Sequence, residues 1–364
     1  MLRLLMVALL ARQARGMMVV LSDEIEEQPG LARQAMKEQY NLRLASNAST
    51  VRLNNGLFLP LVGLGTSLKN NSARAFGVRQ MVEYSVRAGY RHVDTALSYG
   101  VEQEVGAALR TIFKEGIVAR DDLWISSKLP NYSHKFDDVE KTLDVTLNHL
   151  GLEYLDLYLI HWPAASDEFG MVLSEPTLEE TWRAMEKLVD SGKVKTIGLS
   201  NFSPKKIQDI LRIARIMPAV LQCEVHPKFR QDFLLEYAAH HHIHVTAYAP
   251  LGSSDQPWNH QVHLMQLDEV KDIAKDLDKT TGQILLRWGI QRGTSVIPKS
   301  STPSHIASNL DIFDFTLTDH HMRKLSLVEP QHRIYNGGFM IQNNGVYPTT
   351  HDYWDTNPQG DYLL

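Results

Sequence analysis

Residues 91–128 read RHVDTALSYG VEQEVGAALR TIFKEGIVAR DDLWISSK and contain one complete strand–helix–strand unit. The runs at 91–95 and 123–128 are short, apolar and bounded by polar residues, which is typical of strands buried in a parallel sheet. Between them, residues 102–114 have helical periodicity. Two such strands joined by a helix predict a parallel crossover connection.

The same alternation of strand and helix extends over most of the chain. Strands are expected at 61–65, 91–95, 123–128, 155–160, 194–199, 220–225, 243–248 and 294–297. Helices are expected at 75–88, 102–114, 137–149, 178–190, 204–214, 231–240 and 268–290. Eight such units close most naturally into a (β/α)8 barrel with the helices outside. Residues 51–59 alternate around Asn55-Gly56, which predicts a β-hairpin before the first unit.

A doubly wound sheet is the competing α/β architecture, and it has a recognisable first turn. That fold ordinarily carries three spaced glycines after its first strand, where a dinucleotide phosphate binds. Here Gly63-Leu64-Gly65 is followed by Leu68 at the third glycine position. The three-glycine motif of a doubly wound sheet is therefore incomplete, and this favours the barrel.

Composition and charge exclude several classes of protein. The chain has 364 residues, 43% hydrophobic and 22% charged, which is typical of a globular protein. A net charge of −5 provides no strong basic field, so no nucleic-acid partner is expected. The single cysteine, Cys223, excludes an internal disulfide or a zinc site with several thiolates, and we expect it to be buried apolar filler. No uncharged apolar run approaches the roughly 20 residues of a membrane span.

The first 48 residues differ from the rest of the chain. We expect residues 1–48 to form a poorly ordered extension and residues 49–364 to form the barrel with its long C-terminal loop. Three arginines and no acid precede Asp23, a pattern that a mitochondrial presequence or a short signal peptide would also show. A lone cysteine does not suggest an oxidising compartment, so we expect the cytoplasm, with mitochondria as the alternative.

Ionisable side chains follow three consecutive strands, at the end of a barrel where catalytic groups gather. Asp94 and Tyr99 follow the second strand, Lys128 ends the third and His161 ends the fourth. An ammonium beside Tyr99 would lower the pKa of its phenol from the ordinary value of about 10, and Asp94 would hold Lys128 protonated. With His161 donating a hydrogen bond, the set can give a proton to a developing alkoxide without a metal.

Polar residues also follow the later strands, at Ser200-Asn201, Gln222, Tyr248 and Lys299-Ser300. Taken singly, each could be an ordinary packing residue or ion-pair partner, but their convergence on one mouth favours a functional site. The histidine run 240–244 lies where a helix ends and a strand begins. Its successive side chains point in different directions, so we expect no metal site there.

These motifs resemble the signatures of the aldo-keto reductases, and the resemblance covers about residues 50–335. The three signature motifs are GYRHVDTA at 89–96 followed by Tyr99, Glu102 and Gly106; LGL at 150–152 through LDL at 155–157 to IHWP at 160–163; and IPKS at 297–300. Further blocks lie at 198–202, 221–227 and 248–253. The resemblance implies a barrel enzyme that uses NADPH to reduce aldehydes and ketones to alcohols.

The resemblance also assigns roles to matching residues. Tyr99 would be the general acid, tuned by Lys128 and Asp94, while His161 would orient the carbonyl and Trp162 would line its pocket. Tyr248 would stack on the nicotinamide. The other implied cofactor contacts are Ser200, Asn201 and Gln222 at the carboxamide, Leu251 and Ser253 at the pyrophosphate, and Lys299, Ser300, His305 and Asn309 toward the adenosine end.

The sequence departs from the family pattern at the adenosine end. The family usually has an arginine where this chain has His305, and a glutamate where it has Ser308. Arginine is always charged, whereas histidine is only partly charged near pH 7. We therefore expect NADPH to bind with a weaker preference over NADH, which becomes a possible cofactor, and to bind more strongly below about pH 6.5.

The loop at 129–134 and the aromatic tail at 335–364 should form an apolar, mobile pocket rim that decides the substrate.

We expect a monomer that acts on a small carbonyl compound. The alternative is a cofactor-binding regulatory subunit, because some relatives with this fold serve ion channels as sensors. Turnover of an aromatic aldehyde distinguishes the two hypotheses.

Overall fold

The computed structural model describes residues 49–67, 77–253, 262–343 and 345–363. The expected extension at 1–48 lies outside the described residues, as does the start of the helix expected at 75–88. Within the described ranges, every expected strand is present, with bounds that differ from the prediction by at most three residues.

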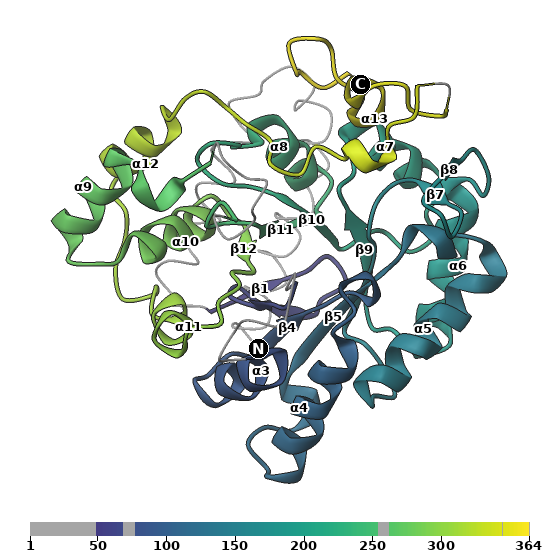
Figure 1. Ribbon diagram of the computed structural model, residues 1–364, viewed down its shortest axis with the longest axis horizontal. Helices are drawn as coiled ribbons and strands as arrows, with labels where there is room; N and C mark the ends of the chain where they lie inside the picture. Colours follow the sequence, from purple (N-terminus) through teal and green to yellow (C-terminus); the bar gives the residue numbers. More distant parts are fainter. Residues whose placement is uncertain (1–48, 68–76, 254–261, 344, 364) are drawn as a thin grey trace, which may run out of the picture. The chain divides into compact units, whose positions relative to one another are not determined.

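The eight strands form one parallel sheet that closes on itself (Figure 1). In sheet order they are β12 (Ser295–Val296), β11 (His244–Tyr248), β10 (Val220–Glu224), β9 (Ile197–Ser200), β6 (Leu157–Ile160), β5 (Trp124–Leu129), β4 (His92–Asp94) and β3 (Leu64–Gly65). A parallel bridge between Val62 and Val296 joins the two ends, and the Val296 N–H donates to the Leu61 carbonyl at 2.8 Å. The sheet is therefore a (β/α)8 barrel.

Helices surround the strands, as Figure 1 shows. They are α3 (Val78–Arg87), α4 (Glu102–Lys114), α5 (Phe136–Leu150), α6 (Leu178–Asp190), α7 (Pro204–Ile213), α8 (Asp232–His240), α9 (Asp268–Leu277), α10 (Thr281–Gln291), α11 (Pro303–Leu310), α12 (Asp319–Ser326) and α13 (Thr350–Trp354). The prediction of one helix over 268–290 is wrong. Asp278, with φ 51°, ends α9, and a capping box between Thr280 and Gln283 begins α10.

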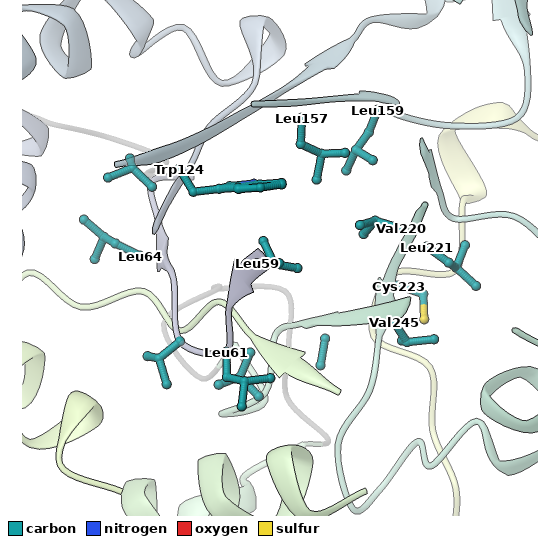
Figure 2. Close-up of a cluster of buried hydrophobic side chains, with 14 of the residues drawn as sticks. Leu59, Leu61, Leu64, Trp124, Leu157, Leu159, Val220, Leu221, Cys223 and Val245 are labelled. Atoms are coloured by element: carbon teal, nitrogen blue, oxygen red, sulfur yellow. The ribbon is translucent and has the colours of Figure 1, made fainter. Parts of the chain in front are cut away.

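The predicted β-hairpin is confirmed as β1 (Thr50–Arg52) paired antiparallel with β2 (Phe58–Pro60). Its Leu59 is fully buried and lies among Trp124, Leu157 and other barrel side chains (Figure 2). The amide of Asn54 donates to the Pro218 carbonyl, which precedes β10. The hairpin thus closes the amino-terminal end of the barrel, and the carboxyl ends of the strands remain as its mouth.

The tail and the loop after β6 build a second apolar cluster beside that mouth. Its buried members are Trp162, Ala164, Val172, Met340, Tyr353 and Trp354. Two aromatic residues expected at a rim, Tyr353 and Trp354, are 0% and 5% exposed, so they are packed core rather than rim. The Glu224 carboxylate anchors the tail by accepting the N–H groups of Ile334 and Tyr335 at 2.7 and 2.8 Å.

Cys223 is buried in β10 beside Leu221 and Val245, as expected of apolar filler (Figure 2). Burial raises the pKa of its thiol to about 12. None of the described helices is long and apolar enough to cross a membrane.

Candidate active site

A buried ion pair lies at the mouth, formed between the ends of β4 and β5. The Lys128 ammonium donates to Asp94 Oδ1 at 2.6 Å and to the Thr95 carbonyl at 2.8 Å. Both side chains are almost fully enclosed, at 1% and 2% exposure. Burial would lower the pKa of Lys128, but the charge of Asp94 and a hydrogen bond with Tyr99 outweigh it, and the pKa lies above its usual value. The lysine therefore stays charged.

Tyr99 is brought over this pair by a short 3-10 turn, η2 (Leu97–Tyr99), which Gly100 ends in the left-handed region at φ 68°. The Lys128 ammonium lies 4.9 Å from the centre of the Tyr99 ring. Burial raises the pKa of the Tyr99 phenol, while the charge and hydrogen bond of Lys128 lower it. The expected lowering by Lys128 is present, but the prediction of a net lowered pKa is wrong because burial outweighs it. At neutral pH the phenol keeps its proton.

His161 follows β6 and faces Tyr99 edge-on, with ring centres 5.6 Å apart. Burial, together with the nearby Lys128 charge, lowers the pKa of His161 well below its usual value, so the imidazole is neutral. The Ser98 hydroxyl lies 3.2 Å from its Nδ1. When Ser98 donates to Nδ1, the single imidazole proton is on Nε2 and can be donated to another group.

Trp162 forms an apolar wall next to His161. It packs edge-on against Phe339 of the tail, with ring centres 5.0 Å apart, and lies 6.2 Å from Tyr353. The wall of the site next to His161 is therefore aromatic, and this favours an apolar group of a ligand at that position.

The residues at the ends of β9, β10 and β11 make two sets of side-chain hydrogen bonds, one around Asn201 and one that reaches the buried pair. Asn201, at φ 64°, donates to the His161 carbonyl at 2.9 Å and to the Ser200 hydroxyl at 3.1 Å. Its own carbonyl oxygen accepts from Tyr248 at 2.7 Å. Gln222 donates to Asp94 Oδ2 at 2.8 Å. Four residues predicted to converge are thus brought together.

Beyond β11 the chain turns through left-handed conformations at Ala249 (φ 48°), Gly252 (φ 80°) and Ser253 (φ 46°). The turn carries Leu251 and places the Ser253 hydroxyl 3.1 Å from that of Tyr335 in the tail. Strained backbone of this kind clusters at ligand sites.

The remaining candidates lie after β12, around the start of α11. Ser300 accepts the N–H of Thr302 at 3.1 Å, and His305 is exposed in the first turn of the helix. Asn309, near the other end of α11, is 5% exposed. Lys299 precedes Ser300 beside the barrel closure, where the Gly65 N–H donates to the Pro298 carbonyl at 3.0 Å.

The sequence reasoning missed polar partners of the site. The Thr95 carbonyl and the Ser98 hydroxyl contact Lys128 and His161, and the side chains of Ser126 and His92 lie behind Asp94. The two-residue period of a strand could have predicted His92 and Ser126, because side chains two residues apart point to the same face of the sheet. His92 precedes Asp94 by two residues, and Ser126 precedes Lys128 by two.

Chemically, the arrangement offers a protonated phenol, a fixed ammonium and a neutral imidazole around one opening. These groups can donate hydrogen bonds and a proton to an oxygen that gains negative charge. Among the residues that the structure describes, no three side chains that bind metals gather in one place.

Comparisons with known proteins agree with this geometry. The model of the aldo/keto reductase family matches residues 62–329. An aldo/keto reductase of Synechocystis is 42% identical over 316 residues, 83% of this chain and 95% of that protein. Aldo-keto reductase family 1 member A1-A of Danio rerio is 46% identical over 288 residues, 76% of this chain and 88% of that protein.

Solved structures are similar over the same region. The aldose reductase of Schistosoma japonicum superposes with a TM-score of 0.74 at 39% identity, covering 80% of this chain and 96% of its own. An aldo-keto reductase of Bombyx mori, solved in complex with NADP, superposes with a TM-score of 0.75 at 33% identity, covering 86% of this chain and 99% of its own.

Proposed function

Because the chain belongs to the aldo/keto reductase family, we propose that it reduces aldehydes or ketones to alcohols with NADPH and with Tyr99 as the general acid. The observation that carries the proposal is the buried Asp94–Lys128 pair in contact with the Tyr99 phenol, beside a neutral His161. The Bombyx mori relative was solved with NADP, which supports the choice of cofactor.

The residues at the mouth fit a nicotinamide dinucleotide. Ser200 accepts from Asn201 and retains its own proton, which it can donate to a carboxamide oxygen. The Gln222 amide has a second N–H to donate, and Asn201 Oδ1 can accept from the carboxamide nitrogen. The half-buried ring of Tyr248 offers a flat face for stacking. The turn at 251–253 would hold the pyrophosphate. The first turn of α11, with exposed His305, presents the positive end of a helix dipole to a phosphate.

In this mechanism the cofactor supplies a hydride to the carbonyl carbon. Tyr99 donates its phenolic proton to the carbonyl oxygen as negative charge develops there. The Lys128 ammonium stabilises the phenolate that remains, and Asp94 keeps Lys128 charged and in place. The N–H of neutral His161 orients the carbonyl oxygen, while Trp162 and its aromatic neighbours exclude water.

The test is oxidation of NADPH at 340 nm with a simple aromatic aldehyde. We expect turnover by the wild type and a loss of about 10²- to 10⁴-fold in Y99F, which removes the proton donor. Y237F is a matched control, because the buried Tyr237 hydroxyl on α8 has no hydrogen-bond partner among the described residues. Full activity in Y99F would refute the role of Tyr99. No turnover by the wild type, across a panel of aldehydes and ketones with either cofactor, would favour the regulatory-subunit alternative.

A further inference from the structure

The second carboxylate oxygen of Asp94 belongs to a hydrogen-bonded chain that runs away from the mouth. Asp94 Oδ1 is taken by Lys128, whereas Oδ2 accepts from Ser126 Oγ at 3.2 Å and from Gln222 at 2.8 Å. Ser126 Oγ in turn lies 2.8 Å from His92 Nε2. His92 and Ser126 are 1% and 0% exposed, so both are enclosed in the barrel.

The direction of this chain follows from the protons available. An ionised carboxylate only accepts hydrogen bonds, so the single hydroxyl proton of Ser126 points to Asp94. If that proton pointed to His92, Ser126 Oγ and Asp94 Oδ2 would lie 3.2 Å apart with no proton between them, and both are buried away from water. Ser126 therefore accepts from His92 with the imidazole proton on Nε2. The Pro60 carbonyl is a second acceptor near the ring, but Nδ1 makes no hydrogen bond within the described part of the chain. Burial lowers the pKa of His92 to about 4, so it donates as a neutral imidazole.

The backbone fixes the position of His92. A Cβ at Gly63 would lie 2.5 Å from His92 Nδ1, so the ring packs directly on a position that tolerates only glycine. The strand register places Asp94 opposite Ser126 across β4 and β5. The imidazole thus has little room to turn, and its N–H is held toward Ser126.

We propose that His92 and Ser126 are positioning residues for the catalytic acid: they hold the Asp94 carboxylate in the orientation that pairs with Lys128 under Tyr99. This inference rests on the proposed role of Tyr99. The titratable groups that face Tyr99 are Asp94 of β4, Lys128 of β5 and His161 after β6. Neither His92 nor Ser126 touches substrate, so their effect is transmitted through Asp94.

The loss of a donor to Asp94 has a predictable sign. A carboxylate with fewer donors is free to rotate from Lys128, and its negative charge is less compensated. The charge of Asp94 acts to raise the pKa of Tyr99. Alcohol oxidation, the reverse reaction, requires the Tyr99 phenolate, so the ascending limb of its pH profile should move to higher pH.

The experiment uses S126A, H92M and the double variant, assayed in both directions. We expect each single variant to lower kcat about tenfold with little change in KM, and to move the ascending limb of oxidation upward by about one pH unit. Since both act through one chain, the double variant should be no worse than the poorer single variant. H92Q should recover most of the activity, because the glutamine amide can donate from the Nε2 position.

A matched pair on the other side of the barrel is the control. His244 Nε2 lies 3.1 Å from Ser295 Oγ, which has the Thr246 hydroxyl as a further neighbour at 2.8 Å. H244M and S295A remove the same residue types from a histidine–serine contact that does not lead to Asp94, in which Ser295 is fully buried and His244 partly exposed. We expect them to leave kcat and the pH profile near those of the wild type.

A second measurement does not depend on activity. Nitrogen-15 NMR of the wild-type protein should show His92 as the neutral tautomer protonated at Nε2 from pH 6 to pH 8. A proton on Nδ1, additive losses in the double variant, or equal effects in the control pair would overturn the proposal while leaving the proposed function intact. An inactive wild type would instead refute the proposed function, and this inference with it.

Discussion

The buried ion pair between Lys206 and Asp355 makes the strongest test of how the tail is attached. Lys206 Nζ donates to Asp355 Oδ2 at 2.6 Å and to the Tyr353 carbonyl at 2.7 Å, and Ser203 Oγ donates to the same carboxylate oxygen. The side chains are 8% and 13% exposed. Figure 1 shows α13 near α7, the two elements that this pair connects.

The perturbation is D355N, which leaves the Lys206 ammonium buried without its carboxylate. Breaking a fully buried pair costs about 3–5 kcal/mol, and partial exposure of Asp355 reduces this to about 2–4 kcal/mol. For a domain of this size that is a fall in Tm of roughly 4–10 °C. E179Q is the control, because Glu179 and Arg183 are about half exposed and such a pair contributes under about 1 kcal/mol.

The pH dependence of the defect has a definite sign. Burial lowers the pKa of Lys206, and Asp355 opposes that lowering. A lysine whose pKa is lower in the folded state destabilises it below the folded pKa, and this penalty disappears as pH rises toward the unfolded pKa. In D355N the lowering should be larger, so the Tm difference from the wild type should shrink between pH 7 and pH 9.5.

The same variant should affect the pocket, because Trp162 packs against Tyr353 and Trp354. We expect KM for an aromatic aldehyde to rise more than kcat falls. The measurements are thermal unfolding by circular dichroism at both pH values, and steady-state kinetics. A Tm within 1 °C of that of E179Q, which corresponds to about 0.5 kcal/mol or less, would refute the view that this pair holds the tail.

Three further predictions concern other parts of the molecule. K128M leaves Asp94 buried and unpaired, so kcat should fall at least about 10²-fold and the protein should lose about 3 kcal/mol of stability, measured by urea unfolding; retained activity would contradict the mechanism. H305R should raise the preference for NADPH over NADH about tenfold, since arginine is always charged and its planar fork fits a phosphate; unchanged cofactor affinities would exclude His305 from the phosphate site. Cys223 should react with a thiol reagent at pH 8 only after unfolding, because burial raises its pKa to about 12; rapid labelling of the native protein would contradict its burial.

The barrel was predictable because its signal is local and repeated. Each strand is a short apolar run, and in a parallel barrel all carboxyl ends meet at one mouth, so residues far apart in sequence such as Asp94 and Gln222 could be expected to converge. Their contact at 2.8 Å bears this out. The roles assigned to these residues stay predictions until the variants are measured.

Features that depend on several distant segments were not predictable in the same way. The break at Asp278 is invisible to hydrophobic periodicity, because the apolar face continues on both sides of it, although Thr280 and Gln283 carried a capping signal. The burial of Tyr353 depends on Lys206, about 150 residues earlier, which no local pattern connects to it. The net pKa of Tyr99 depends on how deeply the whole fold encloses it, whereas sequence reveals only its charged neighbour.

Burial at the mouth determines the state of both proton donors in opposite ways. It raises the pKa of the Tyr99 phenol and lowers that of the His161 imidazole, so both groups are neutral near pH 7. In both cases the charged form is the one that loses hydration, which is why a single cause gives opposite shifts. The remaining charge on Lys128 is compensated by Asp94, and it lies where a phenolate would form rather than where a carbonyl would bind. Under the proposed function, a site with this distribution of charge would bind a neutral carbonyl without electrostatic cost. Its stabilisation would then act mainly on the charge that develops during proton transfer, which is the condition for catalysis rather than tight substrate binding.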